Sequence, residues 1–210
     1  MNRFFAALAT VVCLACLSLT ASADTLKFVS DSGVNVGGVD IYPYNFQING
    51  SSTMTTLMCI DFGREVSFGE SWQVTANALP MDSSTLSQQY RADAWLFSQM
   101  GKGNYLTSDL QYAAWSILDL CGVQSNSAFD AMAQQLAKTA MQQAINPTLL
   151  SNGFYAGFTL YQPTSNSSGW TNGIPQEFIG AAQTPEPSSF ILMGSGLASF
   201  AGVVRRRLRP

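Results

Sequence analysis

Few side chains in this sequence can act as nucleophiles or as acid–base groups. Of its 4 cysteines, only Cys59 and Cys121 lie beyond the N-terminal apolar segment, and there is no histidine. The lack of histidine excludes Ser-His-Asp and Cys-His catalysis and histidine-ligated metals. Asp61 with Glu65, or Glu65 with Glu70, offers the pair of carboxyls that a glycosidase needs. Solvated charges at the edge of a sheet explain these acids equally well, so they do not by themselves indicate an enzyme.

Two short segments carry a more specific pattern. Cys59 lies in the run Leu57-Met58-Cys59-Ile60-Asp61, and Gln111 begins the run Gln111-Tyr112-Ala113-Ala114-Trp115. Together they resemble the thioester domains of bacterial surface adhesins, with Leu110 where that family has threonine. About residues 36 to 120 also resemble a group of PEP-CTERM proteins, through the further matches Gly69-Glu70-Ser71-Trp72 and Ala92-Asp93-Ala94-Trp95.

The resemblance implies an internal thioester between Cys59 and Gln111. The thiolate attacks the side-chain carbonyl of the glutamine, ammonia leaves, and the product is a stored electrophile. An amine of a host or matrix molecule can then attack the thioester and become covalently joined. Gln111 lies three residues after Ser108, at an expected helix N-terminus whose backbone N–H groups would stabilise the oxyanion.

Simpler interpretations of the same residues remain open. Ser108 and Gln111 have the spacing of a capping box, in which the glutamine bonds back to the serine amide. Cys59 and Cys121 can instead form a disulfide, which would stabilise the fold by about 3–4 kcal/mol. Cys59 can also be a free, merely buried thiol. Because Cys59 has one sulfur, the thioester and the disulfide exclude each other.

The C-terminus has the layout of a sorting signal. Pro185, Glu186 and Pro187 precede a nearly uncharged run over 188–204, and Arg205, Arg206 and Arg207 follow it. A helix of that length spans about 26 Å and is close to crossing a bilayer, with the arginines on the cytoplasmic side. The three parts in this order resemble the PEP-CTERM signal, which implies an exosortase partner, a transient membrane anchor and a Gram-negative source that secretes exopolysaccharide.

The N-terminus and the charge distribution agree with export. Residues 1–23 are laid out as a signal peptide, with Arg3 before an apolar run and cleavage predicted after Ala23. From residue 24 to 184 there are 5 Lys+Arg and 12 Asp+Glu, a net charge of −7. This acidic middle excludes a nucleic-acid partner, and no metal-ligand spacing or cofactor motif occurs.

The middle of the chain, 24–182, is predicted to be an α+β domain with a β-rich N-terminal half, sandwich-like or barrel-like, packed against about three helices. Apolar alternation and turn residues predict the strands, and serine caps predict the helix starts. The expected strands are 25–29, 41–48, 54–62, 66–75, 154–161 and 174–179, with a hairpin turn at Asn49-Gly50 and a loop or linker over 163–173. The expected helices run from Ser83 or Ser84 to Met100, over 109–120 after a Ser108 cap, and over 127–145 before Asn146-Pro147.

These observations predict a secreted surface or exopolysaccharide-matrix protein with a structural or adhesive role, not an enzyme. Its expected partners are exosortase and an exopolysaccharide or amine-bearing surface ligand. One alternative is an enzyme that acts on matrix polysaccharide. Another is a periplasmic protein that keeps its C-terminal transmembrane helix as a permanent tail anchor.

Overall fold

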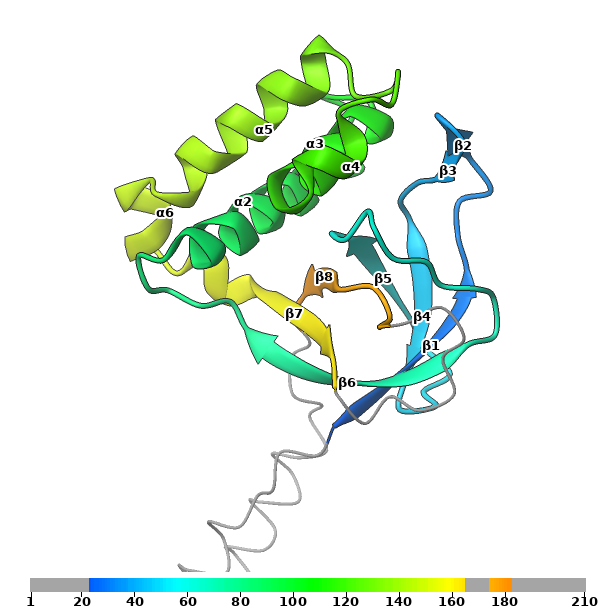
Figure 1. Cartoon of the computed structure of the whole chain (residues 1–210). Helices are drawn as coiled ribbons and strands as arrows, with labels where there is room; N and C mark the ends of the chain where they lie inside the picture. Colours follow the sequence, from blue (N-terminus) through cyan, green and yellow to red (C-terminus); the bar gives the residue numbers. More distant parts are fainter. Residues whose placement is uncertain (1–22, 165–173, 183–210) are drawn as a thin grey trace, which may run out of the picture.

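The computed structural model describes residues 23–164 and 174–182, in which six antiparallel strands close into a barrel (Figure 1). The strand order around the barrel is β1-β4-β5-β8-β7-β6, and β2 and β3 form a separate two-stranded ribbon. The bounds are β1 Asp24–Ser30, β2 Asn35–Val36, β3 Val39–Asp40, β4 Tyr44–Ile48, β5 Met54–Cys59, β6 Ser71–Ala78, β7 Phe158–Pro163 and β8 Phe178–Ala181.

The barrel closes around alternating apolar side chains. Along β4, Tyr44, Phe46 and Ile48 are buried, and the residues between them are only half-buried, as expected for one inward-facing side per strand. The ring centroid of Phe46 lies 4.7 Å from that of Phe178 and 5.8 Å from that of Trp72. Aromatic rings from three strands therefore fill the centre of the barrel, as in small barrels without a channel.

The predicted hairpin between β4 and β5 is confirmed. Asn49 has φ 51° and Gly50 has φ 71°, and the Ser51 N–H donates to the Ile48 carbonyl at 3.0 Å, so the two residues form a tight turn with both centres left-handed. This turn opens a longer connection, which runs over 49–53. Asn49 also holds the start of β1, because its side chain accepts from the Thr25 N–H at 2.8 Å and donates to an Asp24 carboxyl oxygen at 2.7 Å. Asp24, the first residue of β1, directly follows the cleavage site predicted after Ala23.

The helices lie together on one side of the barrel (Figure 1). The three long helices agree with the expected three, and two short helices were not predicted. Asp119 caps the first short helix and Asn146 the second, each with a side-chain oxygen bonded to a backbone N–H at 3.0 Å. Asn146-Pro147, which was predicted to follow the end of the third long helix, also begins the second short helix, because proline fits the first position of a helix. The bounds are α2 Thr85–Gln99, α3 Thr107–Leu118, α4 Leu120–Val123, α5 Ala131–Ala144, α6 Pro147–Ser151 and the 3-10 helix η1 Phe154–Gly157.

Several predicted boundaries were wrong. Helix α3 begins after Leu106, which makes no side-chain cap, so Ser108 lies in the first turn and is not the cap. Ser84 does cap α2, as predicted, by accepting from the Ser87 N–H. Strand β5 ends at Cys59 and β6 starts only at Ser71, so a loop occupies much of the two predicted strands.

Three expected segments lie outside or mostly outside the described residues. These are the signal peptide 1–23, most of the linker 163–173 and the C-terminal signal 185–210 with its expected span over 188–204. Within 23–164 and 174–182, no helix has the length and apolar character needed to cross a membrane.

The helices and the outer face of the barrel share a second apolar core. Met58 of β5, Leu160 of β7 and Ile179 of β8 point away from the barrel interior and pack with buried residues of α2, α3 and α5. Cys59, one residue after Met58, instead belongs to the core inside the barrel, with Tyr112 and Trp115 of α3. Helix α3 therefore covers the end of β5 and contacts both cores.

Arg91 of α2 ties the helices together from a buried position. It is 2% exposed, and its guanidinium donates to the Ala144 carbonyl at 3.0 Å and to the carbonyls of Pro80 and Asp82 at 2.7 and 3.0 Å. Ala144 is the last residue of α5, so the positive charge lies at the negative end of that helix.

Replacing Arg91 with alanine should lower the free energy of unfolding by about 3 kcal/mol, because buried carbonyls lose a charged donor. Urea unfolding measures the change. Lys138→Ala, an exposed site on α5, is the matched control and should stay within about 0.5 kcal/mol of the wild type. Equal losses in both variants would contradict this role of Arg91.

Candidate functional site

Cys59 is the last residue of β5 and is completely buried. It pairs with Phe178 of β8, which fixes its backbone at the edge of the barrel beneath α3. Its thiol donates to the Asp61 carbonyl at 3.3 Å and accepts from the indole N–H of Trp115 at 3.5 Å. The strand thus places the sulfur against α3, at the turn that carries Trp115.

Gln111 of α3 is also completely buried and lies against Cys59. Its side-chain nitrogen donates to the backbone carbonyl of Cys59 at 2.7 Å. Among the residues that the structure describes, its side-chain oxygen Oε1 has no hydrogen-bond partner. The two residues singled out in the sequence, 52 positions apart, are therefore neighbours in the fold.

The capping-box interpretation of Gln111 is wrong. Helix α3 starts one residue before Ser108, and the glutamine side chain bonds across to β5 and not back to the serine. Gln111 is the fifth residue of α3, so it lies beyond the first turn, whose backbone N–H groups lack partners within the helix. The expected oxyanion donors therefore lie one turn before the glutamine.

Burial keeps the Cys59 thiol protonated. It raises the pKa of Cys59 to about 12, although the hydrogen bonds with Trp115 and Asp61 act in the opposite direction. Because the thiolate is the nucleophilic form, attack on a neighbouring carbonyl requires a group that removes the thiol proton.

The alternative disulfide between Cys59 and Cys121 is absent from the structure, in which both thiols are free. Cys59 points into the barrel core, whereas Cys121 is exposed on α4, beyond the end of α3. A bridge would need one of the two side chains to leave its environment.

The acidic residues Asp61, Glu65 and Glu70 lie in the loop between β5 and β6 and not on a strand. Asp61 pairs with Arg64 at 3.0 Å, and its pKa is raised by burial, an effect that Arg64 opposes. Glu70 accepts from the Ser67 N–H at 2.5 Å in the turn before β6. Glu65 is exposed and lines a hollow of about 260 Å³ with Asp31 and Asp40. Asp61 and Glu70 do not line that hollow, so neither predicted pair of carboxyls comes together in it.

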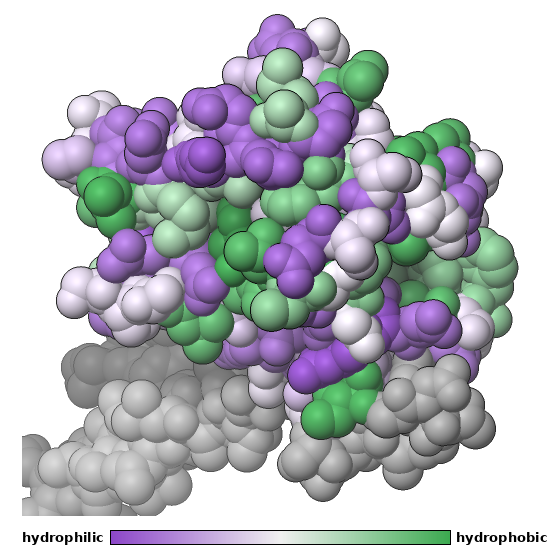
Figure 2. All heavy atoms as spheres, turned by 45° about the horizontal axis from the view of Figure 1, so that its top comes forward, coloured by the Kyte–Doolittle hydropathy of each residue, from purple (hydrophilic) through white to green (hydrophobic). Residues whose placement is uncertain are grey.

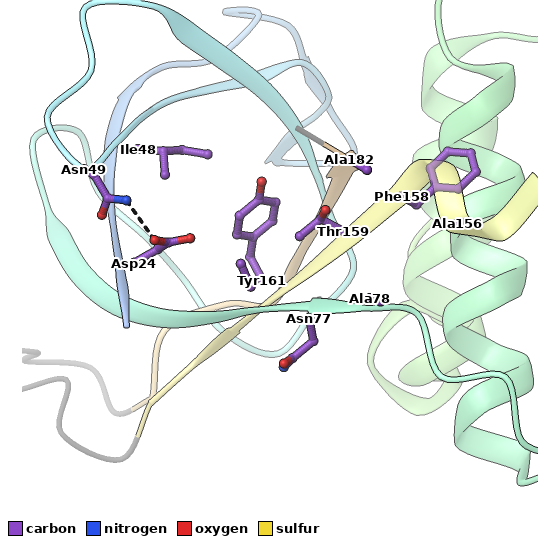
Figure 3. Close-up of a pocket in the computed structure, with 11 residues that line it drawn as sticks. Asp24, Ile48, Asn49, Asn77, Ala78, Ala156, Phe158, Thr159, Tyr161 and Ala182 are labelled. Carbon is purple, nitrogen blue, oxygen red and sulfur yellow. Dashed lines mark hydrogen bonds between the residues drawn. The ribbon is translucent and has the colours of Figure 1, made fainter. Parts of the chain in front are cut away.

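A second hollow, of about 310 Å³, opens at the end of the barrel where β1 starts. Figure 3 shows Asp24 bonded to Asn49 on one side of it, with Tyr161 and Thr159 opposite. Among the lining residues that the structure describes there is no cysteine, and Asp24 is the one carboxylate. This hollow offers hydrogen-bonding groups but no thiol.

The surface shows no continuous apolar face in the view of Figure 2, where hydrophobic residues are scattered among polar ones. The most exposed large apolar side chains come from separate loops and helix ends, among them Phe68, Leu106 and Ile174. Isolated residues of this kind are normal on a soluble surface. The Cys59–Gln111 pair therefore remains the most specific chemical feature of the described residues.

Sequence reasoning missed two groups near this pair. Trp115 was noted as part of the motif, but its bond to the thiol was not expected. Asp93 of α2 is fully buried, and neither of its carboxyl oxygens has a partner within the described part of the chain. A signal was present, because Asp93 is a lone acid three residues after Tyr90 and four before Phe97, on the apolar side of its helix.

Comparison with known families identifies one segment. The PEP-CTERM protein-sorting motif matches residues 183–207, which include the predicted Pro-Glu-Pro and arginine parts. The motif implies export, a membrane-anchored precursor and processing by exosortase. Neither a curated protein nor a solved structure matches the chain significantly, and no comparison supports the resemblance to thioester domains.

The class of protein is thus defined by the C-terminus: this is an exosortase-targeted, exported chain. The domain that it carries is a closed six-stranded barrel covered by helices, with a buried cysteine and glutamine in contact.

Proposed function

We propose that this chain is a structural or adhesive protein of the cell surface or exopolysaccharide matrix, in which an internal Cys59–Gln111 thioester reacts with an amine-bearing ligand and attaches it covalently to residue 111. The observation that carries the proposal is the 2.7 Å bond from the Gln111 amide to the Cys59 carbonyl, with Oε1 of the same side chain unpartnered among the described residues. A buried polar atom without a partner costs free energy, so it favours a functional explanation.

The reaction balances within the pair. Sγ of Cys59 bonds to the side-chain carbonyl carbon of Gln111, the bond from that carbon to Nε2 breaks, and ammonia leaves with the thiol proton. When an amine later attacks the same carbon, an amide forms and the thiol is regenerated. Because the ligand stays attached, each chain reacts once, and the protein acts by attachment and not by turnover.

Burial supports a stored electrophile. Both residues are 0% exposed, and Phe62 packs over Trp115 with ring centroids 5.1 Å apart. Exclusion of water protects a thioester from hydrolysis. A ligand amine reaches the buried carbonyl only when the residues around it move, so small amines are the suitable probes.

Intact mass of the exported chain, without reductant, tests the proposal. Once its termini are fixed from terminal peptides, the chain should be about 17 Da lighter than its composition, and methylamine should add about 31 Da. A deficit of about 2 Da, removed by reductant, would instead show the Cys59–Cys121 disulfide. Either that result or an unshifted mass would overturn the thioester.

A further inference from the structure

Asp93 is a carboxyl group held in an apolar interior. It is 0% exposed between Ala92 and Ala94, which are also 0% exposed. Both of its oxygens lack a hydrogen-bond partner among the described residues. Burial raises its pKa well above the ordinary value, and the nearby charge of Glu177 adds to the shift. Burial therefore favours the neutral form of Asp93, in which one oxygen can donate a proton and the other can accept one.

The fold places the part of α2 that carries Asp93 near the end of the strand that holds Cys59. Tyr90, one turn earlier on α2, donates to a Glu177 carboxyl oxygen at 2.9 Å, and the Glu177 carbonyl accepts from the Ile60 N–H at 3.1 Å. Phe178, the next residue after Glu177, pairs with Cys59. This face of α2 thus lies over the strand ends that hold the cysteine.

Two further observations connect the carboxyl to the reacting groups. In its charged form, Asp93 is one of the causes that raise the pKa of Cys59, so the carboxyl and the thiol interact electrostatically through the protein interior. Helix α2 also packs along α3, which carries Gln111. The neighbourhood therefore contains a thiol that must lose a proton and an amide nitrogen that must gain one. It also contains an acid that can accept the first proton and donate the second.

We propose that Asp93 transfers the proton during thioester formation: one carboxyl oxygen takes the Sγ proton of Cys59 while the other gives its proton to Nε2 of Gln111. Ammonia leaves, the sulfur–carbon bond forms, and the carboxyl ends protonated as it began. No net charge develops in the dry site, where an isolated charge would be costly. This proposal rests on the thioester proposed above.

The test follows thioester formation in freshly made protein. The full-length chain is synthesised in a cell-free system with detergent micelles, samples are quenched with acid, and the fraction about 17 Da lighter is followed over time. Asp93→Asn should form the thioester at least about 100-fold more slowly than the wild type, the usual effect of losing a general acid–base group. Glu65→Gln, the control, removes an exposed carboxyl from the loop after β5 and should keep the rate within a few-fold.

A second variant separates chemistry from folding. Asp93→Leu replaces an unpartnered buried carboxyl with an apolar group of similar shape, which should keep or raise the melting temperature. It should nevertheless be as slow as Asp93→Asn, with an unchanged near-ultraviolet circular dichroism spectrum. Wild-type rates in both Asp93 variants would overturn the role of Asp93 and leave the thioester standing. A wild-type chain without the mass deficit would overturn both proposals.

Discussion

Replacing Pro185, Glu186 and Pro187 together with alanine is expected to leave the chain in the membrane as an unprocessed precursor. These residues lie within the segment that matches the sorting motif, and the motif implies processing by exosortase. Without processing, an apolar segment long enough to approach the thickness of a bilayer keeps the chain anchored. Fractionation and immunoblotting should then find the variant in the membrane and the wild type processed to a shorter form.

Pro210→Ala is the matched control for this experiment, because Pro210 is a proline beyond the matched residues 183–207. It should be processed like the wild type. Release of the triple variant at the wild-type rate would show that the motif is not used. A wild-type chain found only at full length in the inner membrane would favour the permanent tail anchor.

Local signals in the sequence predicted several elements well. The alternation over 25–29, the Asn49-Gly50 turn and the Ser84 cap each depend on contacts between residues near in sequence, and the structure has all three. The sorting motif was predicted for a similar reason, since its parts occur in a fixed order along the chain. Such features need no knowledge of the tertiary fold.

Features that depend on distant residues were harder to predict. The barrel closes only because β8 pairs with β5, at Met58↔Ile179, and no local signal in the sequence fixes that register. The role of Gln111 was ambiguous for the same reason. Its spacing from Ser108 suits a cap, but the Cys59 carbonyl across the interface is the partner that it has in the fold. Tertiary contacts decided between two interpretations that the local sequence supported equally.

Burial links the two proposals. An electrophile that must survive export has to be shielded from water, and the same shielding raises the thiol pKa to about 12. A protected site is therefore also one in which the cysteine cannot lose its proton unaided. A neutral buried acid answers that requirement, because it exchanges protons without bringing a charge into the interior.

Removing either member of the pair should abolish covalent labelling by amines. Cys59→Ala lacks the sulfur, and Gln111→Ala lacks the carbonyl carbon, so neither can form the thioester. Methylamine should therefore add to the wild-type chain and leave both variants unlabelled, as measured by intact mass and by peptide mapping of the 111 position. Gln111→Ala should also destabilise the fold by about 1–3 kcal/mol, because the buried Cys59 carbonyl loses its donor.

Cys121→Ala distinguishes the two uses of Cys59. Cys121 is an exposed free thiol, so its removal should leave both the mass deficit and the methylamine adduct of the wild type intact. If a Cys59–Cys121 disulfide formed instead, the same variant would free Cys59 and remove a deficit of about 2 Da that reductant also removes. Because one sulfur cannot take part in both bonds, labelling that persists in Cys121→Ala and disappears in Cys59→Ala and Gln111→Ala assigns the sulfur to the glutamine.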